Sequence, residues 1–143
     1  MEKFVPLISS GVAGPLGVLH LPRLWLKTSL ENAGKIADGY PGCGAGYDQM
    51  VLDGLGVDRE AFLKFIETKP TYIQCENWIR ENGSQVDEAS IQKLNAAITG
   101  YEHADETRRE ILANAGLPDG EPRDAINLNN LDDWDEFYSA VIK

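Results

Sequence analysis

Apolar residues recur every three or four positions along most of the chain, which is the spacing of helices that bury one face. No stretch keeps the strict alternation of apolar and polar residues that marks a half-buried strand. We therefore predict an all-α fold that forms a single compact domain over residues 1–143. It has about seven short helices: 20–36, 47–56, and segments that begin at Asp58, Pro70, Asp87, Asp105 and Asp132.

Residues 4–21 carry no formal charge, and this run is long enough that a membrane helix must be considered. Two prolines and three glycines interrupt the run, and both residue types weaken a helix. A secretion signal also fits poorly, because Glu2 stands beside Lys3 and the apolar run is broken. We expect residues 1–19 to form an irregular arm over the core of a cytoplasmic protein that does not contact a membrane.

The chain has a formal net charge of −10, which argues against nucleic acid as a partner because phosphate binding depends on cations. Residues 1–52 hold four acids and four bases, whereas residues 103–143 hold ten acids and four bases. The first third of the chain, which has no net charge, is therefore where an anionic ligand is repelled least.

The chain has two cysteines, Cys43 and Cys75, which are too few for a disulfide framework. We expect both thiols to be reduced, and a disulfide bond between them is the alternative.

Four glycines fall within residues 39–48, which read GYPGCGAGYD. The segment lacks the lysine of a Walker loop and the glycine spacing of a dinucleotide-binding turn. Its bare amides lead into the predicted helix at Tyr47, and the positive end of a helix attracts anions. Gly44, Gly46 and Tyr47 are thus candidate anion-binding residues. The alternative is a plain glycine-rich connection between two helices.

His20, Arg23 and Lys27 share one face of the first predicted helix, and Lys35 continues near that face two turns later. No acid occurs between Glu2 and Glu31, so this basic face has no local partner. The pattern predicts a pocket for a carboxylate or phosphate. Alternatively, these cations pair with the acidic C-terminal third, for example with Asp132, Asp133, Asp135 or Glu136.

Two residues of this region are candidates for proton transfer or nucleophilic chemistry. His20 titrates near neutral pH and suits a general base, although a histidine that only packs at a helix start is the alternative. Cys43 lies between two glycines near the basic face, which favours a thiolate nucleophile; the alternative is a thiol that only fills space in the apolar core.

His103 is expected to be a solvated loop residue. The cysteines and histidines lack zinc-site spacing, and the acids lack a calcium-loop pattern. We expect no metal and no cofactor.

Residues 17–40, GVLHLPRLWLKTSLENAGKIADGY, are followed by YDQ and then LGVD. This combination resembles a bacterial family known only as a domain of unknown function, number 5069. Weaker similarity continues to the Asp-rich end. The chain departs from the family pattern at Leu26, where an acid is usual, and at Leu94, where tryptophan is frequent. The resemblance implies a helical fold without a known activity. It adds weight to the polar members of the shared pattern: Arg23, Lys35, Tyr40 and Asp48.

Two hypotheses follow from these patterns. In the first, Arg23, Lys27 and Lys35 hold a small anionic metabolite, and His20, Tyr40, Cys43 or Asp48 supply chemistry. An internal ion pair between Arg23 and Asp48 would contradict it. In the second, the protein is a non-enzymatic interaction module or homo-oligomer. Its support is the aromatic C-terminal stripe of Trp134, Phe137, Tyr138 and Val141.

Overall fold

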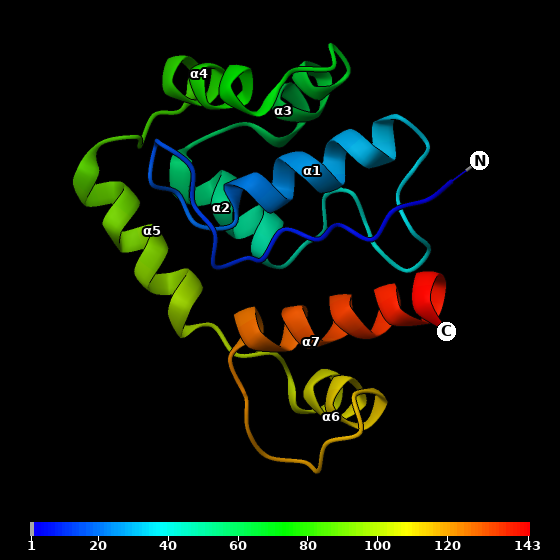
Figure 1. Ribbon diagram of the computed structural model, residues 1–143. Helices are drawn as coiled ribbons and strands as arrows, with labels where there is room; N and C mark the ends of the chain where they lie inside the picture. The colour runs from blue at the N-terminus through cyan, green and yellow to red at the C-terminus, as the bar shows by residue number, and fades with distance from the viewer. Residues whose placement is uncertain (1) are drawn as a thin grey trace.

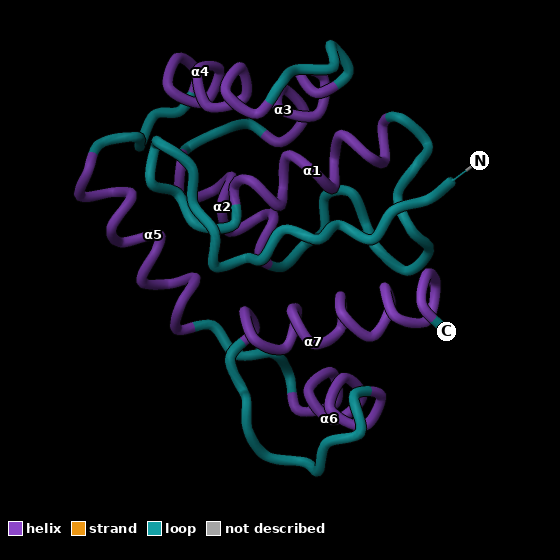
Figure 2. The backbone as a smooth tube through the Cα atoms, in the orientation of Figure 1, coloured by secondary structure: helices purple, strands orange, loops and turns teal. Residues whose placement is uncertain are grey.

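The computed structural model describes residues 2–143 and confirms the all-α prediction across them. Figures 1 and 2 show helices and loops, and within the described residues β-pairing is limited to isolated bridges. The helices are α1 (Leu21–Asn32), α2 (Tyr47–Leu55), α3 (Arg59–Ile66), α4 (Tyr72–Asn82), α5 (Glu88–Gly100), α6 (Asp105–Asn114) and α7 (Ala125–Phe137), followed by a π-helical turn, Tyr138–Ile142.

Helix α1 lies near the middle of the molecule, with α3 and α4 on one side and the α6–α7 pair at the opposite end (Figure 1). It packs against α2, α3 and α4, while α2 also packs on α5, and α5 on α7. The core fills the space between these helices with fully buried apolar side chains, including Leu24, Leu52, Leu55, Phe62 and Ile98. Truncating one of these to alanine typically costs about 2–5 kcal/mol of stability.

Most helix ends follow the capping signals in the sequence. The Asp58 and Asp87 side chains accept hydrogen bonds from the amides of the first turns of α3 and α5. Thr71 and Gln74 form a reciprocal capping box at the start of α4. Gly56 ends α2 in the left-handed conformation, with φ 66°.

Two predicted helix boundaries were wrong. The last helix begins at Ala125 and is capped by Asp124, so Asp132 lies inside α7 and caps nothing. The first helix ends at Asn32 rather than at residue 36, because Gly34 adopts φ 70° and turns the chain away. Lys35 is therefore not on the helix that carries His20, Arg23 and Lys27.

Residues 2–19 form the predicted irregular arm; residue 1 lies outside the described part. The arm is tied to the core by hydrogen bonds rather than by a helix. The amide of Leu16 donates to the buried carboxylate of Glu76 at 3.1 Å, and Asn95 bonds both Leu19 N at 3.0 Å and Gly17 O at 2.7 Å. Across residues 2–143, no helix has the length and apolarity needed to cross a membrane.

The arm passes so close to α4 that Gly14 leaves no room for a side chain. A Cβ at this position would lie 2.5 Å from Tyr72 Cε2 and 2.6 Å from Glu76 Oε2. We expect Gly14→Ala to lower the free energy of unfolding by about 1–3 kcal/mol, since the arm must shift off Glu76. Gly100→Ala is the matched control, because a Cβ there meets open space. Urea unfolding of both variants measures the difference, and equal stabilities would contradict the close approach.

Candidate functional site

A cavity of about 420 Å³ opens beside the N-terminal half of α1. Its wall brings together segments that are distant in the sequence. His20, Arg23 and Lys27 come from α1 and its cap, and residues 39–48 supply the glycine-rich side. The remaining wall includes Tyr101, His103, Asn129 and Asp132. The volume falls within the range of small-molecule sites in proteins.

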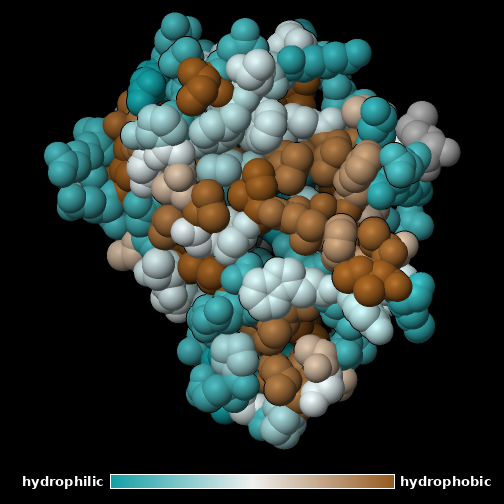
Figure 3. Space-filling model, viewed as in Figure 1, coloured by the Kyte–Doolittle hydropathy of each residue, from teal (hydrophilic) through white to brown (hydrophobic). Residues whose placement is uncertain are grey.

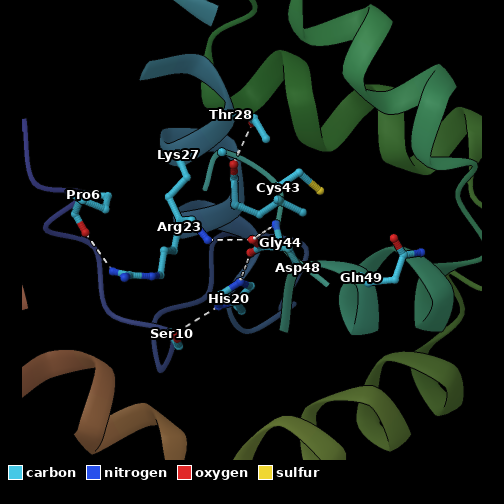
Figure 4. A network of polar contacts seen from close by, with 12 residues as sticks. Pro6, Ser10, His20, Arg23, Lys27, Thr28, Cys43, Gly44, Asp48 and Gln49 are labelled. Carbon is cyan, nitrogen blue, oxygen red and sulfur yellow. Dashed lines mark hydrogen bonds and ion pairs between the residues drawn. The ribbon is translucent and has the colours of Figure 1, made fainter. Parts of the chain in front are cut away.

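Asp48, in the first turn of α2, is the centre of a buried polar network at this wall (Figure 4). Its Oδ1 lies 2.6 Å from His20 Nε2, and its Oδ2 accepts from Lys27 Nζ at 2.6 Å and from the Gly44 amide at 2.7 Å. Burial alone would raise the pKa of this carboxyl. The bond from His20 and the charge of Lys27 outweigh burial and hold the pKa well below its ordinary value. Asp48 is therefore a carboxylate, and both of its oxygens accept hydrogen bonds.

His20 is the N-cap residue of α1 and is buried, with φ 70°. Burial lowers its pKa and outweighs the opposing influence of Asp48, so the ring is neutral at neutral pH. Because Asp48 is ionised, Nε2 carries the ring proton and donates to it. Nδ1 is then an acceptor, and the Ser10 hydroxyl lies 2.9 Å from it. Both ring nitrogens of His20 are thus engaged.

The network continues from Ser10 to α7. Ser10 Oγ accepts from Asn129 Nδ2 at 3.3 Å, and Asn129 Oδ1 lies 2.8 Å from His103 Nε2. His103 lies in a loop, as predicted, but it is only partly exposed, lines the cavity and contacts Asn129 rather than solvent alone. Ser10 and Asn129 were not predicted as site residues, because nothing in the sequence around either of them indicates that it lies close to His20.

Arg23 does not pair with Asp48. Its guanidinium binds Asp133 of α7 through two bonds, Nη1–Oδ2 at 2.5 Å and Nη2–Oδ1 at 3.0 Å, with both side chains buried. Nη1 also donates to the carbonyl oxygens of Pro6 and Ile8 in the arm. For Arg23, the alternative prediction is therefore the correct one: this cation pairs with an acid of the C-terminal third.

Tyr40 joins the same cluster, since its hydroxyl donates to Asp133 Oδ1 at 3.1 Å. Burial and the charge of Asp133 raise the pKa of Tyr40 far above its ordinary value. The phenol is therefore a firmly protonated donor at the cavity wall rather than a base.

A family described as Domain of unknown function (DUF5069) matches residues 10–137 of the chain. The chain belongs to this family. The match confirms the resemblance seen in the sequence, and the DUF5069 region contains the whole network from Ser10 to Asp133. No curated protein matches the chain.

Several residues predicted for the site of this DUF5069 protein have other contacts. Lys35 is exposed beyond Gly34 and does not line the cavity. The Tyr47 hydroxyl donates to Ile98 O at 2.6 Å, and the Gly44 amide bonds Asp48, so neither is free for a ligand. Gly46, by contrast, lines the cavity at the start of α2, where no side chain caps the helix.

Cys43 differs most from its predicted role. Its side chain packs against the core and is absent from the cavity wall. Burial and the charge of Asp48 raise the pKa of the thiol, which is the opposite of what a thiolate nucleophile requires. The prediction of a favoured thiolate was wrong. Arg59, which lowers this pKa, is bonded to the Cys43 and Gly44 carbonyls and to Gln49.

Asp132 is a residue of the cavity wall whose carboxyl group can change its protonation near neutral pH. Its side chain is half-buried in the cavity wall, and no hydrogen bond to its carboxyl exists within residues 2–143. Burial and the neighbouring Asp133 and Glu136 charges raise its pKa to about 6. A carboxyl group with such a pKa can give or take a proton near neutral pH. In the described chain, no three His, Cys, Asp or Glu side chains come together as a potential metal site.

Proposed function

We propose that the cavity binds a small polar metabolite that has a carboxylate or another oxyanion at one end and an amine or hydroxyl at the other. The observation that carries the proposal is the state of Lys27 in the cavity wall. Its ammonium has three N–H donors, and within residues 2–143 a single bond, to Asp48, occupies one of them. A buried ammonium with unused donors favours an oxygen-rich ligand.

The start of α2 lies on the same wall. Gly46 and Tyr47 line the cavity, and no side chain in the described part of the chain caps the first amides of the helix. Those amides and the helix dipole favour negative charge at this end. We therefore assign the oxyanion end of the ligand to Lys27 and the Gly46–Tyr47 backbone.

The other charges of the cavity wall favour a ligand that carries an amine or a hydroxyl as well as an oxyanion. Asp48 balances Lys27, and Asp133 balances Arg23, so the two cations add no net positive charge to the wall. Asp132 adds a negative charge when it is ionised. An amino or hydroxy acid would satisfy both ends, with its amine or hydroxyl on Asp132. This ligand class is narrower than the carboxylate or phosphate predicted from the sequence, because its members must also carry an amine or a hydroxyl.

A ligand panel tests the proposal. Thermal unfolding is followed with simple carboxylates, phosphates, amino acids and hydroxy acids, using the wild type, Lys27→Met and the exposed control Lys64→Met. A ligand at 100 times its Kd adds about 2.7 kcal/mol to stability, a shift of several degrees. We expect the shift in the wild type and the control and its loss in folded Lys27→Met. A panel without any shift in the wild type would overturn the proposal.

The titration of Asp132 gives the site a testable pH dependence. With a pKa of about 6, its carboxyl is mostly charged at pH 7.5 and mostly neutral at pH 5. We expect an amine-bearing ligand to bind about tenfold more weakly at pH 5, which corresponds to the loss of about 1.4 kcal/mol of charge attraction. Isothermal titration of wild type and Asp132→Asn at both pH values measures this. The variant should bind weakly at both; a parallel pH response in the variant would exclude Asp132.

A second candidate function rests on the exposed surface around the C-terminal end of α7. Trp134 is 61% exposed and Val141 65%, although apolar side chains of this size are usually buried. Figure 3 shows apolar side chains along the N-terminal arm and toward this end of α7. An interaction module or homo-oligomer would cover them. Sedimentation velocity at two concentrations of wild type and Trp134→Glu tests this, and a monomer at both would leave the homo-oligomer without support.

A further inference from the structure

Ser10, His20 and Asp48 form a directed chain of hydrogen bonds at the cavity. The Ser10 hydroxyl lies 2.9 Å from His20 Nδ1, and His20 Nε2 lies 2.6 Å from Asp48 Oδ1. With Nε2 protonated, the free lone pair of Nδ1 points at the serine hydroxyl. Hydroxyl, imidazole and carboxylate thus follow one another in the order of a nucleophile, its base and the group that orients the base, with the two ring nitrogens exchanged relative to serine proteases.

We propose that Ser10 is a nucleophile that takes an acyl group from an ester or thioester bound in the cavity, with His20 as its general base. Asp48 is the positioning residue that fixes the ring of His20, and Lys27 and the Gly44 amide hold Asp48 in turn. This inference rests on the proposed function, since the acyl donor occupies the same cavity. It adds to that function a reaction class and a covalent intermediate.

The backbone at His20 is unusual in a way that fits this role. A non-glycine residue with φ 70° occupies a sparsely populated region, and its cost persists where surrounding contacts over-determine it. Here the His20 amide donates to Val12 O at 3.2 Å, and its carbonyl accepts from Leu24 N at 2.9 Å. These bonds hold the backbone of His20 in this conformation, in which its ring lies between Ser10 of the arm and Asp48 of α2.

Access to Ser10 is controlled by Asn129. Ser10 is fully buried and is not on the wall, whereas Asn129 lines the cavity and lies 3.3 Å from Ser10 Oγ. This bond is at the long end of the hydrogen-bond range, so little is lost when the amide side chain rotates away. The rotation exposes the hydroxyl to the cavity, and it also releases His103 from Asn129 Oδ1. Asn129 is therefore the cover of the nucleophile.

The reaction is balanced by the groups present and one acyl donor. Ser10 Oγ forms a bond to the acyl carbon while its proton passes to His20 Nδ1. The alcohol or thiol leaves with the bonding electrons and takes that proton from His20. Water then attacks the acyl-serine in the same way, which releases a carboxylic acid and restores the Ser10 hydroxyl. The ionised Asp48 stabilises the imidazolium that forms between these transfers.

The experiment uses p-nitrophenyl acetate as a small, uncharged acyl donor. Intact-mass and peptide mass spectrometry locate acetyl groups in wild type, Ser10→Ala, His20→Gln and Asn129→Ala. Ser9→Ala is the matched control, because Ser9 is adjacent and more exposed but has no histidine beside it in this network. We expect acetyl-Ser10 in wild type and in Ser9→Ala, at a rate about tenfold higher in Asn129→Ala. His20→Gln should lower the rate by roughly 10²–10⁴-fold.

Acetylation that spares Ser10 in both wild type and Asn129→Ala would overturn the nucleophile, and this result does not depend on how well His20→Gln folds. A panel ligand that still raises the unfolding temperature in that case would leave the cavity proposal standing. Acetyl-Ser10 together with a silent ligand panel would instead support the nucleophile and reject the amino-acid and hydroxy-acid ligands.

Discussion

Replacement of Asp133 by asparagine is expected to lower the free energy of unfolding by about 3–5 kcal/mol, since it leaves the buried guanidinium of Arg23 without a counter-charge. Asparagine keeps the shape of the side chain, so the loss reports charge and hydrogen bonding rather than a cavity. Glu136→Gln is the matched control on the same helix, because Glu136 is exposed. Urea unfolding at pH 7 measures both variants.

A double variant sharpens this test. Arg23→Met combined with Asp133→Leu removes both charges, and apolar replacement of a buried ion pair is often tolerated. The double variant should nevertheless regain only part of the lost stability, because the Pro6 and Ile8 carbonyls lose the hydrogen-bond donor that Arg23 supplies. If Asp133→Asn alone were as stable as Glu136→Gln, the buried ion pair between Arg23 and Asp133 would not be what stabilises this part of the fold.

Replacement of Asp48 by asparagine is expected to destabilise the protein by a similar amount, about 3–5 kcal/mol at pH 7, because Lys27 loses its buried counter-charge. The effect should depend on pH in a defined direction. The pKa of Asp48 is lower in the folded protein than the ordinary 3.8, so its stabilisation is complete above about pH 4 and is lost as the pH falls further.

Wild type and Asp48→Asn should therefore differ most near neutral pH and converge in acid. Asp53→Asn is the control, since Asp53 lies on the same helix but is exposed. Guanidinium unfolding at pH 7, 4 and 3 gives the three differences. A gap between wild type and Asp48→Asn that stays constant down to pH 3 would show that the charge of Asp48 is not what stabilises this network.

Local signals predicted the helices well, because capping is a short-range interaction. Asp58, Asp87 and Gly56 act where the sequence places them, since each bonds or turns the chain within a few residues. The start of α7 was predicted wrongly for a related reason. Asp132 stands just before the aromatic stripe and was therefore predicted as its cap, but the helix begins upstream of the stripe, where Asp124 is the capping residue.

The site was predicted only in part. Helical spacing correctly placed His20, Arg23 and Lys27 together on one wall, and the glycine-rich segment forms the neighbouring wall. Their partners could not be predicted, since Arg23 and Asp133 are 110 positions apart and Ser10 and Asn129 are 119 apart. For Cys43 the error was to infer an exposed thiol from the glycines on either side of it. The exposure of a thiol depends on packing that neighbouring glycines do not reveal, and Cys43 packs against the core.

The two long-range bonds also constrain the order in which the molecule can be assembled during synthesis. Arg23 holds the arm through Pro6 and Ile8 and holds α7 through Asp133, so the guanidinium joins the N-terminal arm to the last α-helix. A nascent chain on the ribosome has made the arm and α1 long before residue 133 leaves the exit tunnel. Until then the arm lacks the ion pair that joins it to α7, and Ser10 lacks its hydrogen bond from Asn129. The site is therefore completed only once α7 has emerged.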